Sequence, residues 1–481
     1  MTQFLIASAG ADTAPAVPLS VTLLFAALLL GLIVCLALEE KIHAKKSIIA
    51  GVFAIVCLFL ANVDDLYRFT DAHKYVVELP SFDGGRGHMV ELPVYIPAID
   101  WGVIGLIFGA SLFIDVTSKS GLFTWIAIKL TKASKGDPRR LLWFYGLMTV
   151  VFSAVLNNVA AMIIVGSLTG VSLGKLGRKN LLLGFLMIEG LLTNVGGLLT
   201  LISSVPNIII GNAAGISFVE FFIKAAPFVS VATVLTIMLG AKLFKIEKIT
   251  EPADRADALR LVGAFDENDG IESWGLFWFG AVMLALFILT IATTSVLPVI
   301  RDLGMSFVAL SFAAIMLVRY KSTVDQFYRA VDWDLLGFFA ALFVVINVME
   351  HALVLDLIGT GLTKVIGLND LLGYGAGTGS ILVSSAAASS VTDNIPLAAM
   401  LSKILQAQGT ASTDPLWWAV VFGCNLGGNL TPIGSASTLV AVTIMHKNEV
   451  SMSFGRFVGL ALPFAIMQIV LATAYVLLFL A

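Results

Sequence analysis

The chain has 481 residues, of which 58% are hydrophobic and 13% are charged, and its formal net charge is −3. Soluble proteins carry about 25% charged residues, so this composition excludes an ordinary soluble domain and indicates a protein that crosses a membrane several times. The chain contains no basic cluster interleaved with aromatic residues, and no nucleic-acid partner is expected.

Apolar runs of about 20 residues can cross the roughly 30 Å of hydrocarbon as helices. In chain order, the expected spans are residues 19–38, 48–63, 100–118, 182–213 with a break after 193, 218–243, 274–293, 304–318, 335–349, 416–444 with a break after 424, and 456–480. Two further apolar stretches, 141–173 and 371–406, carry polar residues near their middle and fit re-entrant helical hairpins. The prediction is an all-α polytopic membrane protein with about 10 to 11 spans and two hairpins.

The distribution of Lys and Arg predicts the orientation of these spans, because cytoplasmic loops carry the excess of basic residues. The basic stretches, all assigned to the cytoplasm, are 41–46, 129–140, 175–179, 242–260 and 319–329. The first hairpin is flanked by two of these stretches, whereas the flanks of the second hairpin contain no Lys or Arg. The two halves of the chain therefore have opposite orientation, and both termini are expected outside a bacterial cytoplasmic membrane.

An internal repeat supports this arrangement. Residues 194–207 (NVGGLLTLISSVPN) and 425–438 (NLGGNLTPIGSAST) share Asn, Gly-Gly, Thr and Ser at the same positions without a gap. Further similar blocks follow in the same order: 153–158 with 389–394, 218–228 with 454–464, and, more loosely, 113–132 with 345–364. The sequence thus predicts two inverted-topology repeats, in which interrupted helices mark the binding site of a transporter.

The two Gly-Gly stretches are expected to be the points where the helices unwind. Gly196–Gly197 and Gly427–Gly428 lack a Cβ, and Pro206 and Pro432 lack a backbone N–H, so both features weaken a helix. Around the breaks, amide and hydroxyl groups suited to an ion or small substrate are Asn194, Thr200, Ser203, Ser204, Asn207, Asn425, Thr431, Ser435 and Ser437. The alternative is that the glycines form a helix-packing face without a ligand.

Each hairpin has a polar dipeptide at its expected tip, Asn157–Asn158 in the first and Asp393–Asn394 in the second. Helix ends at such a tip leave backbone groups unpaired. Carboxylate, amide and carbonyl oxygens suit a desolvated cation such as Na⁺, whereas exposed N–H groups suit an anion. The alternative for the asparagines is a purely structural role as hydrogen-bonding links between helices.

Two acidic residues lie at membrane depth and are candidates for proton coupling. Asp393 stands in the second hairpin, and Glu189 lies in an apolar run five residues before Asn194. A carboxylate at this depth is costly unless it binds a cation or a proton, so Asp393 is interpreted as a shared Na⁺/H⁺ site. For Glu189, a structural pairing with a buried donor is an equally open interpretation.

At these residues the chain resembles the ion transporter superfamily, which includes NhaD-type Na⁺/H⁺ antiporters, arsenite permeases of the ArsB type, the melanosomal P protein and INDY-type dicarboxylate carriers. The hairpin tips fall where INDY-like carriers have Ser-Asn-Thr, and residues 196–207 resemble their G-G-x-x-T-x-I-G-x-P-x-N element. LEEKIHAKKS (38–47), SSVTDNIPLAAM and GGNLTPIGSAST look most similar to NhaD-type antiporters. The resemblance covers nearly the whole chain.

The resemblance implies a homodimeric elevator transporter with a scaffold and a transport domain in each protomer. The implied divisions are an external tail (1–18), scaffold helices (19–135), the first part of the transport domain (136–244), a cytoplasmic linker (245–272), scaffold helices (273–369) and the second part of the transport domain (370–481). The implied Na⁺ ligands are Asn157, Asn158, Ser203, Ser204, Asp393, Asn394, Ser435 and Ser437. Two departures affect the coupling: Asn157 and Ser204 stand where many relatives have an acid.

The leading functional hypothesis is secondary Na⁺(Li⁺)/H⁺ antiport, and the alternative is a Na⁺-coupled or uncoupled permease for a small anion such as arsenite, sulfate or a dicarboxylate. The lack of Lys and Arg in the broken elements and hairpin tips favours a cation, but helix N-termini can bind a carboxylate without them. The sequence has no nucleotide-binding Walker A motif, no catalytic constellation and no His/Cys metal spacing. We therefore expect no enzyme and no cofactor, with Na⁺ and H⁺ as transported ions and membrane lipids as partners.

Overall fold

The computed structural model describes residues 17–63, 66, 75–79, 88–321, 324–367, 375–392 and 394–480. Across these residues the protein is built from helices and one pair of short strands, and ten of the helices are long and apolar enough to cross a membrane. The prediction of a helical polytopic membrane protein is therefore confirmed. Several predicted spans match the observed helices closely, including 218–243, which forms a helix with the same bounds.

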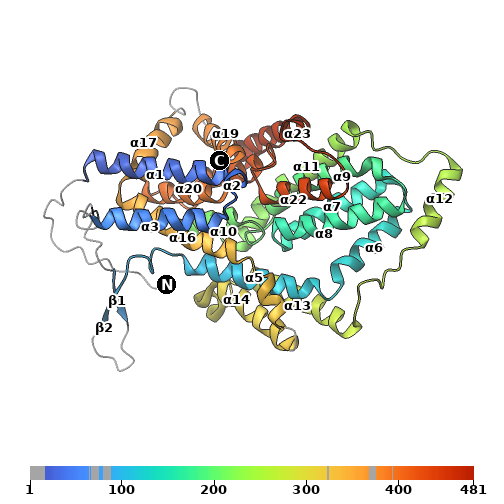
Figure 1. The fold of residues 1–481 in the computed structure, drawn as a ribbon, viewed down its shortest axis with the longest axis horizontal. Coiled ribbons are helices and arrows are strands. Elements are labelled where there is room, and N and C mark those ends of the chain that lie inside the picture. The colour runs from blue at the N-terminus through green and yellow to red at the C-terminus, as the bar shows by residue number, and fades with distance from the viewer. Residues whose placement is uncertain are drawn as a thin grey trace.

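The first half of the chain contains two hairpin helices and one interrupted helix among its spans (Figure 1). Its elements are α1 (Leu19–Ala37), α2 (Glu39–Ile42), α3 (Lys46–Val63), β1 (Tyr75–Leu79), β2 (His88–Leu92), α5 (Trp101–Ser118), α6 (Leu122–Ser134), α7 (Pro138–Val155), α8 (Asn158–Lys175), η1 (Lys179–Leu181), α9 (Leu182–Gly197), α10 (Val205–Ala214) and α11 (Phe218–Leu243). The hairpin is α7–α8, and the interrupted helix is α9–α10.

The second half repeats this order after α12 (Pro252–Gly263), which lies in the predicted linker. Its elements are α13 (Trp274–Ala292), α14 (Pro298–Arg319), α15 (Val324–Ala330), α16 (Trp333–His351), α17 (Val354–Ile366), α19 (Ala376–Val391), α20 (Asn394–Ala407), α21 (Pro415–Gly427), α22 (Ala436–Lys447), α23 (Phe454–Tyr475) and a π-helical turn at Val476–Leu480. The hairpin is α19–α20, and the interrupted helix is α21–α22.

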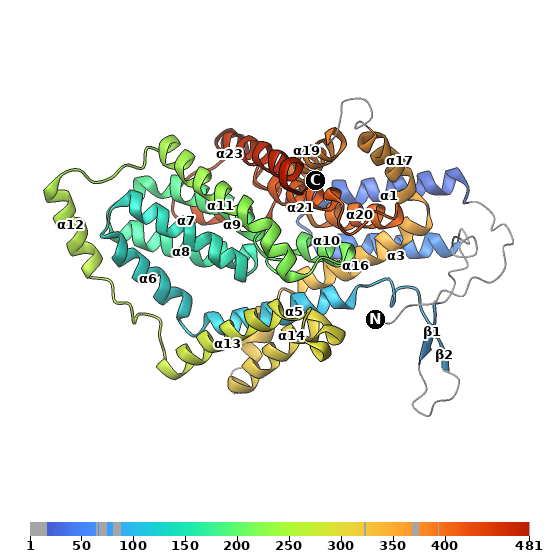
Figure 2. The same cartoon turned by 180° about the vertical axis from the view of Figure 1, so that it is seen from behind.

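The strands β1 and β2 depart from the all-α prediction. They pair antiparallel, with Tyr75 opposite Leu92 and Leu79 opposite His88, in the segment between the expected spans 48–63 and 100–118. Val76 and Val77 are β-branched residues, which favour strands over helices. This small hairpin projects from the helical body (Figures 1 and 2).

The repeats interlock through their hairpins. The first hairpin, α7–α8, packs on α9 of its own repeat and on α22 of the other repeat, and the second hairpin, α19–α20, packs on α21 and on α10 in the same way. Each hairpin therefore contacts the first half of its own interrupted helix and the second half of the other one. Figures 1 and 2 show α7, α8, α9, α11 and α22 at one end of the molecule, and α1, α3, α16 and α20 at the other.

The helices α6 and α17 are equivalent elements that lie between the expected spans and the hairpins, where the sequence predicted only the loosely similar blocks 113–132 and 345–364. Each follows a residue in the left-handed conformation, Gly121 with φ 80° before α6 and Leu353 with φ 58° before α17. Each then contacts the hairpin that follows it, so α6 lies against α7 and α8, and α17 against α19 and α20. The two helices link the preceding spans, α5 and α16, to the two hairpins.

The linker between the repeats is tied to α6 by one acidic residue. Glu267 pairs with Lys129 at 2.7 Å and with Lys132, both on α6. Hydrogen bonds from Lys129 and Lys132 lower the pKa of the Glu267 carboxyl from its usual 4.5 to about 2. The linker is thus held by charge at the surface, where salt screens such pairs.

We predict that the attachment of the linker depends on pH in one direction. Because the pKa of Glu267 is lower in the folded protein, its contribution is fully present above pH 4.5 and is lost as the pH falls towards about 2. At neutral pH, Glu267→Gln should therefore expose the linker to faster trypsin cleavage, and salt at about 1 M should do the same to the wild type. Asp269→Asn, an exposed neighbour, is the control and should leave the cleavage rate unchanged.

Candidate substrate and ion site

The two interrupted helices break later than the sequence analysis expected. The first half of each helix reaches its Gly-Gly pair: α9 ends at Gly197, the second glycine of its pair, and α21 ends at Gly427, the first glycine of its pair, rather than at 193 and 424. The irregular segments are 198–204 and 428–435. The residue after each helix, Leu198 and Gly428, has ordinary right-handed helical angles, so the glycines do not serve to unwind the chain.

The glycines instead allow the hairpins to approach very closely. A methyl group on Gly196 would lie 2.7 Å from the Cα atom of Val150 in α7. At the equivalent position, a methyl group on Gly427 would overlap the carbonyl oxygen of Ala386 in α19 and lie 2.8 Å from its Cα atom. The packing face that the sequence analysis held as the alternative is therefore the role of these two glycines.

The breaks are joined across the repeats by a reciprocal pair of hydrogen bonds. The Ser204 hydroxyl donates to Oδ1 of Asn425 at 2.8 Å, and the Ser435 hydroxyl donates to Oδ1 of Asn194 at 2.9 Å. Each serine precedes the second half of its interrupted helix, but neither side chain caps that helix. All four side chains are buried, so each repeat supplies the partner that the other repeat needs.

The tip of the first hairpin is part of the same cluster. Asn158 donates from Nδ2 to Oδ1 of Asn194 at 3.3 Å and accepts at its own Oδ1 from the Ser153 hydroxyl at 2.8 Å. The Ser437 hydroxyl also lies 3.2 Å from Oδ1 of Asn194. The predicted residues Asn158, Asn194, Ser435 and Ser437 are thus brought together, whereas Asn157 uses its Oδ1 to cap α8 at the Ala160 N–H.

Three of the predicted hydroxyl groups hold the breaks in place. Thr200 donates to the carbonyl of Ala154 at 2.6 Å, and Thr431 donates to the carbonyl of Ser390 at 2.5 Å, so each break is tied to the end of a hairpin helix. Ser203 lies within 2.8 Å of two carbonyl oxygens of its own break. Because these hydroxyl hydrogens are already paired, Thr200, Thr431 and Ser203 position the site rather than donate into it.

A chain of amides joins the two half-sites. Asn207 donates from Nδ2 to the carbonyl of Gly197 at 2.7 Å, and its Oδ1 accepts from Nδ2 of Asn425 at 2.8 Å. Asn425 in turn accepts from Ser204, and Gly197 lies directly against the Asn158 side chain. Seven of the predicted site residues therefore meet in two neighbouring clusters that both repeats share: Asn158, Asn194, Ser435 and Ser437 in one, and Ser204, Asn207 and Asn425 in the other.

The network extends to residues that the sequence analysis did not single out. Asn194 donates to Asn429 at 2.8 Å, Asn429 donates to Gln468 at 2.7 Å, and Gln468 donates to Thr236 at 3.0 Å. Gln468 is a polar residue in the apolar run that forms α23, and a polar residue in such a run is the sequence feature that could have identified it as a candidate. Asn429 lies inside the repeated motif, but the equivalent residue of the other repeat is Leu198, so the motif does not mark Asn429 as a shared polar position.

The second hairpin tip is described only in part. Asp393 lies outside the described residues, while Asn394 begins α20 and is buried. The helix α20 packs on α10 and α21, which places Asn394 on the element that completes the second half-site.

Glu189 is wholly buried in α9. The Thr169 hydroxyl donates to its Oε1 at 2.6 Å, and its Oε2 has no hydrogen-bond partner among the described residues. The predicted structural pairing thus satisfies one of its two oxygens. No group of three or more His, Cys, Asp or Glu residues that could hold a metal ion occurs in the described part of the chain.

The helix ends give the network its electrostatic character. The N-terminal ends of α8 and α22 meet at Asn194, and the N-terminal residue Ser204 of the α10 segment meets Asn425. A helix N-terminus carries roughly half a positive charge, and its first N–H groups are free to bind a ligand when no side chain caps them. The C-terminal ends of α9 and α21 supply carbonyl oxygens beside the same network. Helix ends of both polarities thus lie beside one network, an arrangement that suits small ions.

Comparison with known proteins assigns this architecture to a family. A family model described as "Citrate transporter" (CitMHS) matches residues 33–423. The chain is 32% identical over 384 residues to the 46 kDa membrane protein of Mycobacterium leprae, covering 78% of this chain and 86% of that protein. It is 26% identical to the P protein of Mus musculus over 92% of this chain and 60% of that protein.

A solved structure has the same fold. The YdaH transporter of Alcanivorax borkumensis, described as having an unusual topology, superposes with a TM-score of 0.57 over 90% of this chain and 98% of that chain, at 14% identity. The family match and the similarity to the P protein confirm the resemblance to the superfamily that contains the P protein, whereas the narrower NhaD-type likeness stays a hypothesis.

We predict that Gly427→Ala disrupts the site by forcing α19 away from α21. The added methyl group overlaps the Ala386 carbonyl, and overpacking of this kind costs about 1–3 kcal/mol of stability. Thermal unfolding of the purified protein in detergent should show a lower midpoint, and transport activity should fall with it. Gly459→Ala in α23, where a methyl group meets nothing within 4 Å, is the matched control, and an equal loss there would contradict the argument.

Proposed function

Because the chain belongs to the CitMHS family of membrane transporters, we propose that it is a secondary active transporter for a small anion. The observation that carries this proposal is the meeting of helix N-termini in one buried network of amides and hydroxyls, with Ser204 and Ser435 turned away from capping their own helices. A small carboxylate or oxyanion could bind at these ends without any Lys or Arg.

Coupling to Na⁺ is the second part of the proposal. The proposed Na⁺ ligands are the oxygens of Asn157, Asn158, Ser203, Asp393, Asn394 and Ser435, with carbonyl groups at the ends of α9 and α21. Hard cations prefer such uncharged and carboxylate oxygens, and a cation beside the anion offsets the cost of taking either ion out of water. Protons would be carried by Asp393 and Glu189.

Na⁺(Li⁺)/H⁺ antiport is the second candidate, and one observation favours it. Glu189 is a buried carboxyl group with only one oxygen hydrogen-bonded, at a depth where a carboxylate is costly unless it takes part in ion or proton movement. In this alternative the site binds Na⁺ or H⁺ in turn, with Asp393 as the shared ligand. The amide network would then serve the cation alone.

The proposed mechanism is an elevator movement of the hairpins and interrupted helices against the scaffold helices, in a homodimer in the bacterial cytoplasmic membrane. Both termini would lie outside. One ion pair crosses the boundary between the proposed moving part and the scaffold: Lys403 on α20 lies 3.4 Å from Glu350 on α16. A cavity of about 540 Å³ lies beside this pair between α10, α16 and α20, so the surfaces there are incompletely packed. An exposed ion pair of this kind is weak enough to break at each cycle.

The decisive experiment uses purified protein in proteoliposomes that enclose a pH dye. If the protein is an anion carrier, labelled citrate, sulfate or arsenite should accumulate, and Ser204→Ala with Ser435→Ala should reduce uptake at least tenfold by removing the reciprocal hydrogen bonds. If it is an antiporter, an imposed pH gradient should collapse on addition of Na⁺ or Li⁺ without any anion. In that case Glu189→Gln should shift the pH dependence of the exchange. Collapse of the gradient without anion uptake would overturn the leading proposal.

We predict that fixing α16 to α20 stops transport. Glu350→Cys with Lys403→Cys, joined by a short bifunctional thiol reagent, should abolish uptake, because the proposed movement separates these residues. Reduction of a cleavable reagent should restore it. The native Cys57 and Cys424 are buried, and the protein without the two added cysteines is the control for labelling at Cys35. Full activity in the cross-linked protein would rule out movement at this boundary.

A further inference from the structure

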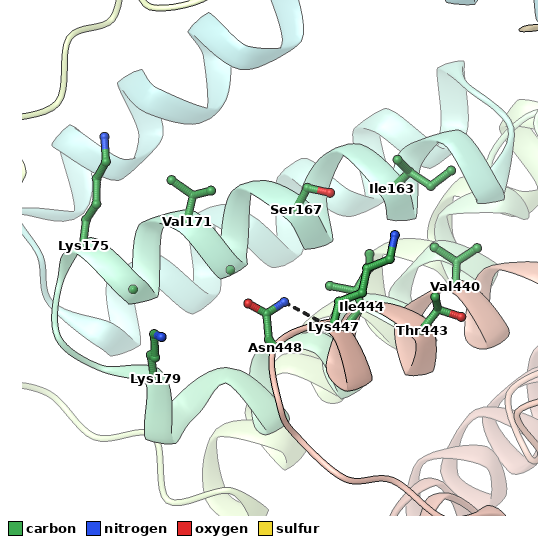
Figure 3. A pocket seen from close by; sticks show the side chains of 12 residues that line it. Ile163, Ser167, Val171, Lys175, Lys179, Val440, Thr443, Ile444, Lys447 and Asn448 are labelled. Atoms are coloured by element: carbon green, nitrogen blue, oxygen red, sulfur yellow. Dashed lines mark hydrogen bonds between the residues drawn. The ribbon is translucent and has the colours of Figure 1, made fainter.

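A cavity of about 680 Å³ lies between α8 and α22, away from the network described above. We propose that it is a binding site for an anionic phospholipid, with the acyl chains along the helices and the phosphate headgroup at the lysine-lined end. Figure 3 shows the two helices side by side, with the cavity opening between them.

The walls of the cavity suit acyl chains. Ile163 and Val171 line it from α8 and are 49% and 54% exposed, although α8 is apolar and long enough to be a membrane span. Val440 and Ile444 line the opposite side from α22. Exposed aliphatic side chains on a membrane-spanning helix face hydrocarbon, so the cavity is open to lipid along this side.

The end of the cavity is basic. Lys175, Lys179 and Lys447 line it together with Asn448, and none of the three lysines forms an ion pair with a carboxylate among the described residues. Figure 3 shows Lys175 and Lys179 at one end of the cavity and the Lys447 amine farther along it, between α8 and α22. The Lys175 amine instead lies over the Phe265 ring at 4.7 Å, so Lys447 and Lys179 are the residues available to a headgroup.

The position of the basic end matches a membrane interface. The sequence assigns residues 175–179 to the cytoplasmic side, and Lys447 ends α22 beside them. Basic pockets between membrane helices on that side are suited to anionic lipid headgroups. A soluble anion would use the lysines alone, whereas the aliphatic walls leading away from them favour a ligand that also has an acyl chain.

The site would connect the two repeats. The helix α8 belongs to the first hairpin and α22 to the second interrupted helix, and both begin at the amide network around Asn194. Asn448 already packs against α8 at Gly170, where a methyl group would lie 3.4 Å from its side chain. A lipid held between α8 and α22 would contact both repeats at once, whichever substrate the protein carries.

The test measures lipid binding to delipidated, full-length protein by native mass spectrometry in detergent. Phosphatidylglycerol should bind at least roughly tenfold more tightly than phosphatidylcholine, and Lys179→Gln with Lys447→Gln should remove this preference. Ser167→Phe, which fills the cavity and keeps the lysines, should weaken binding of both lipids. Lys242→Gln with Lys248→Gln, two exposed lysines outside the cavity, is the matched control and should bind like the wild type.

Two outcomes would overturn the proposal. One is an unchanged preference for phosphatidylglycerol in the Lys179/Lys447 double variant together with unchanged lipid binding in Ser167→Phe. The other is displacement of phosphatidylglycerol by glycerol 3-phosphate or inorganic phosphate at equal concentration, which would assign the lysines to a soluble anion. Lipid binding at this site does not depend on Ser204 or Ser435, so Ser204→Ala with Ser435→Ala should leave it unchanged. That result separates the lipid site from the proposed transport site.

Discussion

The reciprocal hydrogen bonds Ser204–Asn425 and Ser435–Asn194 are the interaction on which the rest of the structure depends. An interrupted helix inside a membrane protein leaves backbone and side-chain polar groups with no water to bind, and each unsatisfied group is costly. Here one serine of each break pairs with an asparagine of the other repeat, while Thr200 and Thr431 pair with the hairpins of their own repeats. These cross-repeat hydrogen bonds form only when the two halves have folded against each other.

Close packing allows these hydrogen bonds to form. Gly196 and Gly427 let α7 and α19 approach the interrupted helices almost at backbone contact. The short distance then lets Thr200 and Thr431 reach the carbonyl groups at the ends of those hairpin helices. The glycines therefore allow the short distance between hairpin and interrupted helix, and at that distance the threonine hydroxyls can donate to the hairpin carbonyl groups.

The same geometry explains why helix ends, rather than charged side chains, define the candidate site. With the serine hydroxyls engaged across the repeats, the N-termini of α10 and α22 stay uncapped. In a region of low dielectric constant these partial charges are screened little, and they act over short distances without the desolvation cost of a lysine. The lysines that the chain does have beside α8 and α22 lie at the far ends of these helices, where a lipid headgroup could reach them.

The sequence by itself determined the spans, both hairpins and the inverted repeat, because apolar runs, Lys/Arg bias and repeated motifs are read from neighbouring residues. It also named Asn158, Asn194, Ser204, Asn425 and Ser435 as candidate site residues. The tertiary structure alone decided which of them meet, since the serine–asparagine partners are 221 and 241 residues apart in the chain. It also reassigned the glycines from unwinding to packing and added Asn429 and Gln468, because close approach and buried pairing are properties of two segments together and no single segment carries them.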